Sequence, residues 1–183
     1  MKTAFIIHGV GGTPQENWFP WLKEELEKIS YQVFIPQFPT PEGQTLDNWL
    51  ATFKEYEKNI NAESIIIGHS LGTPFALAVA ENNKFKAAFS VAGFVGLTGN
   101  IFEEGMKTFT LHDFDWQKIN ANCEKFFIFD SDNDPYVKHE KGEQLKTYLK
   151  NSERITVPGA GHFNESAGYT KFPLILEKIK TVF

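Results

Sequence analysis

Short apolar runs alternate along the chain with stretches in which apolar residues recur every three or four positions. The runs expected to form strands are residues 3–8, 31–35, 64–67, 85–91, 125–130 and 154–157. Several of them are apolar almost throughout, rather than at every second position. Such runs are typical of strands that are buried on both faces of a parallel sheet.

Between these runs, apolar side chains at helical spacing predict amphipathic helices. Four stripes are expected: Trp18, Leu22, Leu26 and Ile29; Leu46, Leu50, Phe53 and Ile60; Leu145 and Leu149, more weakly; and Phe172, Ile175, Leu176, Ile179 and Phe183. Repeated alternation of strand and helix predicts an α/β fold with right-handed crossovers. We therefore expect a mostly parallel sheet of about six strands, with helices on both of its faces.

One segment, residues 94–117, breaks this alternation and shows no strand periodicity. It follows a strand whose carboxyl end should lie near residue 70. Because ligands of open α/β sheets bind at the carboxyl ends of the strands, we expect this segment to wall or partly cover a site there. The alternative is that this segment packs on the surface of the protein and does not contact substrate.

Length, charge and cysteine content narrow the classes of protein. The 183 residues fit a single domain, residues 1–183, with a sizeable core, and no apolar tract is long enough to span a bilayer. The net charge of -5 disfavours nucleic acid and anionic membranes as partners. The one cysteine, Cys123, excludes an intrachain disulfide and suits a reducing compartment, so a cytoplasmic location is expected.

The most informative motif is Gly68-His69-Ser70-Leu71-Gly72, which follows one apolar run and opens a helical stretch. A strand, a sharp turn and a helix form the context of a nucleophile elbow, G-x-S-x-G. A serine hydroxyl is a poor nucleophile unless it is held exposed beside a base. The turn crowds the residues two positions away from the serine, which explains the two glycines. Ser70 is therefore the expected nucleophile.

Two later loops carry residues that could serve as the acid and the base. The strand at 125–130 runs into a turn with several acids, and the next strand ends in a glycine-rich loop with His162. His162 is the expected base, and Asp134 is the expected acid that orients it. Asp132 and Asp130 remain alternatives for the acid.

An early glycine-rich loop, His8-Gly9-Val10-Gly11-Gly12, follows the first strand. Catalysis on a carbonyl needs two donors where negative charge develops. The backbone N–H groups of Val10 and Leu71 are the expected pair. A phosphate-binding loop is the alternative, but the Lys-Ser/Thr ending of a P-loop and the G-x-G-x-x-G spacing are both missing. His8 and His69 are expected to orient backbone or line the pocket.

Motifs along nearly the whole chain, in order, resemble one family. They are Ile7-His8-Gly9, Gly12-Thr13, Asn17-Trp18-Phe19-Pro20-Trp21-Leu22, Gly68-His69-Ser70-Leu71-Gly72, residues 131–137 and Gly161-His162-Phe163. The sequence is similar to the small YdeN-like serine hydrolases, relatives of retinoblastoma-binding protein nine within the α/β-hydrolase fold. The resemblance implies a compact hydrolase without a large lid, and a triad of Ser70, Asp134 and His162.

These inferences together predict a serine hydrolase that cleaves small esters through an acyl-enzyme. No metal and no organic cofactor are expected, and the partner is a small ester or acyl substrate. A non-catalytic or weakly catalytic protein-binding module on the same fold is the alternative, although the intact set of serine, histidine, aspartate and glycine loop speaks against it.

Overall fold

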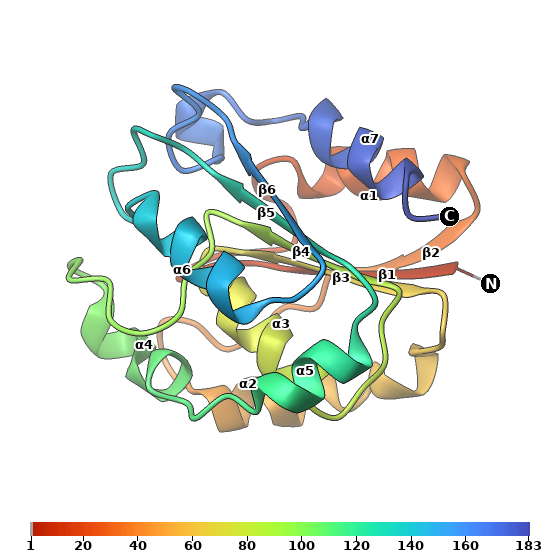
Figure 1. Cartoon of the computed structure of the whole chain (residues 1–183), viewed down its shortest axis with the longest axis horizontal. Coiled ribbons are helices and arrows are strands. Elements are labelled where there is room, and N and C mark those ends of the chain that lie inside the picture. Colours follow the sequence, from red (N-terminus) through yellow and green to blue (C-terminus); the bar gives the residue numbers. More distant parts are fainter. Residues whose placement is uncertain (1) are drawn as a thin grey trace.

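The structure, a computed structural model, describes residues 2–183 and is built around one parallel sheet (Figure 1). The sheet has 6 strands in the order β2-β1-β3-β4-β5-β6, and each neighbouring pair is parallel. The strands are β1 (Lys2–Ile7), β2 (Tyr31–Phe34), β3 (Ser64–His69), β4 (Ala87–Val91), β5 (Phe126–Asp130) and β6 (Ser152–Thr156). The predicted α/β fold with a mostly parallel sheet is confirmed.

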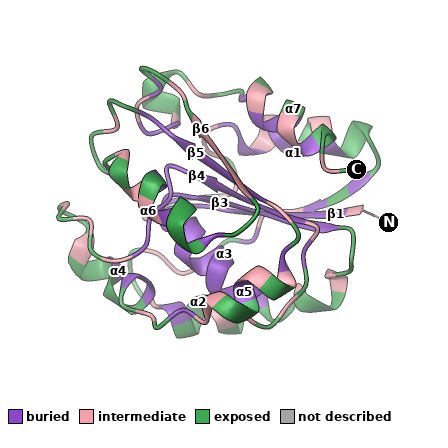
Figure 2. Ribbon diagram, in the orientation of Figure 1, coloured by how far each residue is buried: buried purple, intermediate pink, exposed green. Residues whose placement is uncertain are grey.

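The strands differ in burial according to their place in the sheet. Every residue of β3, β4 and β5 is buried, whereas none of β6, an edge strand, is fully buried (Figure 2). Strands that are covered on both faces need apolar residues at every position. The burial of the inner strands therefore explains their continuous apolar runs.

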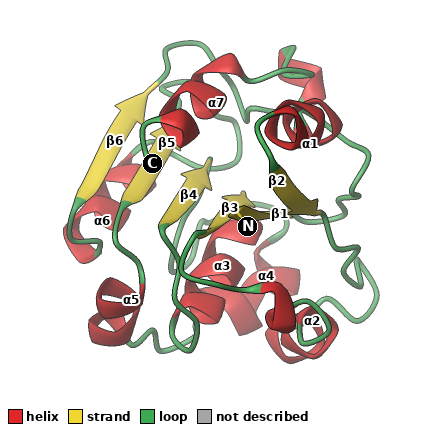
Figure 3. Cartoon of the chain, turned by 90° about the vertical axis from the view of Figure 1, so that its right-hand side faces the viewer, coloured by secondary structure: helices red, strands yellow, loops and turns green. Residues whose placement is uncertain are grey.

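Helices cover both faces of the sheet (Figures 1 and 3). They are α1 (Phe19–Lys28), α2 (Leu46–Phe53), α3 (Gly72–Ala80), α4 (Glu103–Thr110), α5 (Trp116–Asn122), α6 (Glu140–Tyr148) and α7 (Pro173–Lys180), with short 3-10 turns at Glu57–Asn59 and Glu165–Ala167. Side chains of α1 and α7 pack on one face, and those of α2 to α6 pack on the other.

Successive residues of a strand point to opposite faces, and β1 shows how the two cores are separated. Phe5 and Ile7 belong to the core under α3, whereas Ala4 and Ile6 belong to the core under α1 and α7. The sheet thus divides the apolar side chains into two layers, and both are closed by helices.

Two sequence expectations need correction. The stripe through Ile60 predicted a longer second helix, but α2 ends at Phe53, and Ile60 follows the 3-10 turn with an extended backbone. Ile60 still packs against the core because the turn brings the chain back, which preserves the apolar spacing without a helix. Residues 94–117 contain α4 and the start of α5, neither of which was predicted.

The carboxyl ends of all strands meet at one edge of the sheet, since every pairing is parallel. The loops after β1, β3, β5 and β6 therefore converge there, as expected for a ligand-binding edge. No large lid lies over this edge in the described part of the chain. Among residues 2–183, no helix combines the length and the apolar character that crossing a membrane requires.

Candidate active site

Ser70 sits in a sharp turn between β3 and α3, with a left-handed φ of 54°. This conformation is costly for a residue other than glycine, so the surroundings must hold it. The Ser70 N–H donates to the Val91 carbonyl at 2.9 Å, which ties the turn to β4. A Cβ at Gly68 would collide with the backbone of Gly72, and one at Gly72 would collide with the Ile7 carbonyl. Both glycines of the motif are therefore required by close approach.

His162 lies on the loop after β6, and a carboxylate orients its ring. Its Nδ1 lies 2.8 Å from Oδ2 of Asp134, whose side chain is only 1% exposed. The other oxygen, Oδ1, accepts the N–H groups of Tyr136 and Val137 at 2.8 and 3.0 Å. Because a carboxylate only accepts, Nδ1 carries the proton and Nε2 keeps its lone pair. The imidazole is thus set as an acceptor at Nε2.

The other two acidic candidates have different partners. Asp132 accepts the Gly159 N–H at 2.8 Å, which ties the acidic turn to the loop that leads to His162. Asp130 is buried at the end of β5 and pairs with the Arg154 guanidinium through both of its oxygens. Of the three acids, the structure brings Asp134 to the imidazole.

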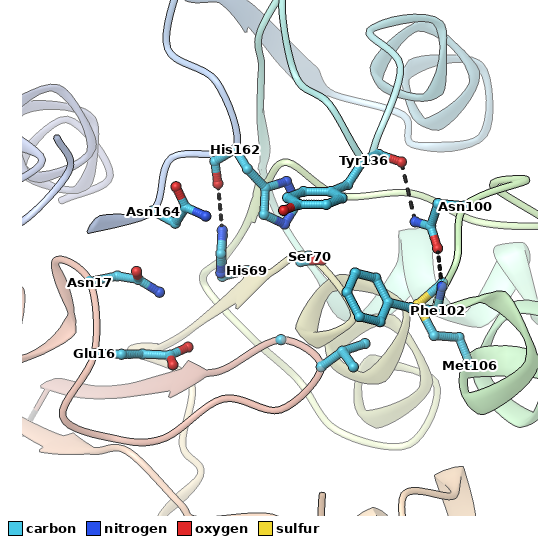
Figure 4. Close-up of a pocket in the computed structure, with 12 residues that line it drawn as sticks. Glu16, Asn17, His69, Ser70, Asn100, Phe102, Met106, Tyr136, His162 and Asn164 are labelled. Carbon is cyan, nitrogen blue, oxygen red and sulfur yellow. Dashed lines mark hydrogen bonds between the residues drawn. The ribbon is translucent and has the colours of Figure 1, made fainter. Parts of the chain in front are cut away.

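Ser70 and His162 open into one cavity of about 230 Å³ (Figure 4). Its lining consists of Gly9, Val10, Glu16, Asn17, His69, Ser70, Asn100, Phe102, Met106, Tyr136, His162 and Asn164. Within residues 2–183, no hydrogen bond joins the Ser70 hydroxyl to the imidazole. Hydrogen bonds between a nucleophile and its base often tighten only when substrate is in place.

The loop after β1 passes directly beside the serine. A Cβ built on Gly9 would lie 3.1 Å from Cβ of Ser70, so the approach leaves room for little more than a glycine. The N–H groups of Val10 and Leu71 find no acceptor in the part of the chain that the structure describes. Two unpaired backbone donors close to a serine can accept a developing oxyanion.

His8 holds this loop from behind. Its Nδ1 donates to the Gly9 carbonyl at 2.8 Å, while its Nε2 accepts the Phe38 N–H at 3.1 Å. Since one ring nitrogen donates and the other accepts, this arrangement requires the neutral imidazole. Burial lowers the pKa of His8, which also favours the neutral imidazole.

His69 supports the loop that carries His162. Its Nε2 donates to the His162 carbonyl at 2.8 Å. Burial, together with the nearby His162, lowers the pKa of His69 to about 3, so its ring is neutral. On the following residue, the Phe163 carbonyl accepts the Trp18 indole N–H at 3.0 Å. Both contacts fix the backbone around His162.

Residues 94–117 contribute Asn100, Phe102 and Met106 to the cavity. Of the other apolar residues in this segment, Phe109 and Phe114 are buried in the core, whereas Leu97 and Ile101 are exposed. The sequence reasoning missed Glu16, Asn17 and Asn164 as lining residues. Glu16 and Asn17 follow the glycine loop closely in the sequence, and Asn164 comes two residues after His162. These positions could have indicated that the three residues line the cavity.

No group of three or more His, Cys, Asp or Glu residues within positions 2–183 is arranged to hold a metal ion. The cavity offers a serine, an imidazole oriented by a carboxylate, and free backbone donors. These groups are the parts required for acyl transfer through a serine.

Comparisons with known proteins show which family the chain is similar to. A family model described as serine hydrolase matches residues 4–181. The chain is 28% identical to the YdeN protein of Bacillus subtilis (strain 168), over 100% of this chain and 96% of that protein. It is also 28% identical to the serine hydrolase RBBP9 of Rattus norvegicus, over 98% of this chain and 94% of that protein.

Solved structures show the same fold. The crystal structure of the ydeN gene product from B. subtilis superposes with a TM-score of 0.93 at 27% identity, covering 100% of this chain and 99% of that one. Est1E from Butyrivibrio proteoclasticus, solved with ferulic acid, gives a TM-score of 0.72 at 18% identity, covering 98% and 90%. At that identity, the second match speaks for the fold alone.

Proposed function

The chain belongs to the serine hydrolase family, and on this premise we propose that it cleaves small carboxylic esters through an acyl-enzyme. The observation that carries the proposal is the contact of His162 with the buried carboxylate of Asp134, in the same cavity as Ser70. The triad consists of Ser70 as nucleophile, His162 as base and Asp134 as the acid that orients the base.

In the first half of the reaction, Nε2 of His162 takes the proton of Ser70 while Oγ attacks the ester carbonyl. The negative charge that forms on the carbonyl oxygen is stabilised by the N–H groups of Val10 and Leu71. Asp134 stabilises the imidazolium through Nδ1. When the tetrahedral intermediate collapses, His162 gives its proton to the leaving alcohol, and the acyl group stays on Ser70.

In the second half, His162 takes a proton from water, which attacks the acyl carbon. The carboxylic acid leaves, and the proton returns to Oγ of Ser70. A metal or an organic cofactor is not needed for either half.

The size of the cavity supports short or medium acyl groups. Its volume of about 230 Å³ is below the roughly 300–1,000 Å³ of pockets that enclose drug-sized ligands. We expect butyrate esters to be better substrates than long-chain triglycerides at an oil interface. An assay across the solubility limit of a long-chain ester should show no interfacial activation.

Labelling with a fluorophosphonate probe tests the nucleophile. The wild type should be labelled, and Ser70→Ala should lose labelling because, among residues 2–183, no other serine lines the cavity together with His162. Ester turnover should fall by several orders of magnitude, as in other triads. Ser152→Ala, at the start of β6 and outside the cavity, is the matched control and should label normally.

Two outcomes would contradict the proposal. Persistent labelling of Ser70→Ala would place the nucleophile elsewhere. A wild type that neither labels nor turns over any ester would favour the alternative, a protein-binding module that keeps the fold without catalysis.

A further inference from the structure

The cavity has two chemically different walls, with Ser70 and His162 between them. Phe102, Met106 and Tyr136 line one side of Ser70, and Glu16, Asn17 and Asn164 line the other (Figure 4). An ester bound for attack places its carbonyl carbon at Ser70, so its acyl part and its alcohol part extend in opposite directions. Each wall must therefore receive a different half of the substrate.

The first wall presents apolar surface even though it contains an asparagine. Nδ2 of Asn100 donates to the Tyr136 carbonyl at 3.2 Å, and its Oδ1 accepts the Phe102 N–H at 2.8 Å. Both polar ends of Asn100 are thus used within the wall. Phe102 and Met106 present aromatic and thioether surface, which suits a hydrocarbon acyl chain, and Tyr136 adds its ring and a single hydroxyl to this wall.

The second wall presents donors that the protein leaves unused. Oδ1 of Asn17 accepts the Glu165 N–H at 2.8 Å, and Oδ1 of Asn164 accepts the Ala167 N–H at 3.1 Å. These contacts decide which end of each amide is oxygen. The NH₂ groups of both residues have no acceptor within residues 2–183.

Glu16 adds an acceptor beside these donors. Its side chain is half-buried and lines the cavity, and it forms no ion pair with any residue in the described part of the chain. Burial raises the pKa of Glu16; a hydrogen bond from the Thr13 backbone opposes this to a smaller extent, and the charge of Glu165 adds slightly to the rise. A carboxylate in such a place gains from a ligand that donates a hydrogen bond.

The mixture of groups selects the class of ligand. An ammonium only donates, so it would meet the amide NH₂ groups without an acceptor for them. A carboxylate or phosphate would be repelled by Glu16. A hydroxyl both donates and accepts, so neighbouring hydroxyls can bond to Glu16 and to the two amides at once.

We propose that Glu16, Asn17 and Asn164 form a subsite for the leaving alcohol, and that this alcohol is a polyol such as glycerol or a sugar. The inference rests on the ester hydrolysis proposed above and specifies its substrate class. The reaction is ester plus water giving acid plus polyol. The bond from Ser70 Oγ to the acyl carbon forms first, while His162 takes the hydroxyl proton. The bond from the acyl carbon to the polyol oxygen breaks when the tetrahedral intermediate collapses, and His162 gives its proton to the departing oxygen.

Two butyrate esters with alcohols of similar size test the subsite. They are 1-monobutyrin, whose alcohol is glycerol, and propyl butyrate, which lacks the two hydroxyls. The wild type should prefer monobutyrin by about tenfold in kcat/KM, since a polar site loses hydrogen bonds to the propyl analogue. Glu16→Met should reduce this ratio about fivefold, because a thioether accepts hydrogen bonds only weakly.

Two further variants separate the subsite from general effects. Glu16→Gln keeps an acceptor of the same size and should retain part of the preference. Glu165→Gln removes a nearby exposed charge that does not line the cavity, so its ratio should equal that of the wild type. If Glu165→Gln lowers the ratio as far as Glu16→Met does, the preference reflects surface charge and the subsite is wrong.

Other results of these assays would overturn the subsite, and one of them would also overturn the proposed function. Equal kcat/KM for the two esters in the wild type, or an unchanged ratio in Glu16→Met, would overturn the subsite while ester hydrolysis stands. Butyrylcholine preferred over monobutyrin would show that Glu16 recognises a cation, which also overturns the polyol assignment. No turnover of any of these esters would overturn the proposed function and the subsite together.

Discussion

His162 and His69 are neighbouring imidazoles that both line the cavity, but their Nδ1 atoms have different partners. Their ring centroids are 4.9 Å apart. His162 lines the cavity and donates to the buried carboxylate of Asp134. His69 is enclosed by the aromatic rings of Trp18 and Phe19, and its Nδ1 has no partner in the part of the chain described.

The difference shows that proximity to the nucleophile does not make a histidine a base. A base must gain a proton during the reaction, and a carboxylate at the opposite nitrogen stabilises the imidazolium that forms. His69 has no such partner, and burial lowers its pKa to about 3. It can therefore serve only as a neutral donor that holds the His162 backbone.

The largest effect is expected when the carboxylate of His162 is removed. Asp134→Asn should lower kcat by about a thousandfold or more, because the amide NH₂ favours the wrong tautomer of His162. The asparagine oxygen can still accept the backbone N–H groups of Tyr136 and Val137, so stability should change little. Kinetics on p-nitrophenyl butyrate, with folding checked by circular dichroism, measure both quantities. Activity close to wild type would mean that His162 does not depend on this partner.

The second prediction concerns the neutral histidines and the stability of the fold. The folded-state pKa values of His8 and His69 lie below 6.5, so the unfolded chain binds more protons at acidic pH. The stability that the two neutral rings contribute is fully present above the pKa of an unfolded histidine, 6.5. It is lost as the pH falls below that value, and for His69 the loss continues down to its folded-state pKa of about 3. Each group should contribute a slope of about 1.4 kcal/mol per pH unit between its two pKa values.

Urea denaturation at pH 7.5 and 5.5 measures this slope. His69→Gln keeps an amide donor for the His162 carbonyl and cannot titrate. As the pH is lowered, its free energy of unfolding should fall less steeply than that of the wild type, because its unfolding takes up about one proton fewer. An identical slope in the variant would show that His69 is not the neutral, enclosed group described above.

The smallest effect is expected at the neighbouring acid. Asp132 accepts the Gly159 N–H rather than a proton of the imidazole. An asparagine oxygen can accept the same N–H, so Asp132→Asn should change kcat less than about threefold, as surface substitutions usually do. The same ester assay measures it beside Asp134→Asn. If Asp132→Asn were the inactive variant, the acid would have been assigned two residues too late.

The sequence predicted the sheet well because its signals are strong. Inner strands such as β3 and β5 must be apolar at every position, and the pattern of the printed sequence shows this directly. The elbow was equally readable, because close contacts allow only glycine at positions 68 and 72. Rules of this kind act on neighbouring residues, so one sequence is enough to see them.

Other features depend on contacts between distant loops. The helix α4 has 8 residues, as many as α2 and α7, and its buried Met106 and Phe109 stand at helical spacing, so this repeat was readable and was missed. The helix α5 has 7 residues and buries only Ile119, which is too little for a clear apolar repeat. Glu16 and Asn164 come from different loops, and only the folded sheet places them on one wall. The choice among Asp130, Asp132 and Asp134 likewise depends on where Arg154 and Gly159 lie, which the pattern of residues did not reveal.

The contact between the Trp18 indole and the Phe163 carbonyl has a consequence for the order of folding. It joins positions separated by 145 residues. Such distant pairings form slowly, because the intervening chain must be organised before they can close. We expect a refolding chain to regain its helices and the Ser70 turn before the loop of His162 docks. Reactivity toward a fluorophosphonate would then return last, because it requires the loop of His162 to be docked against the N-terminal part of the fold.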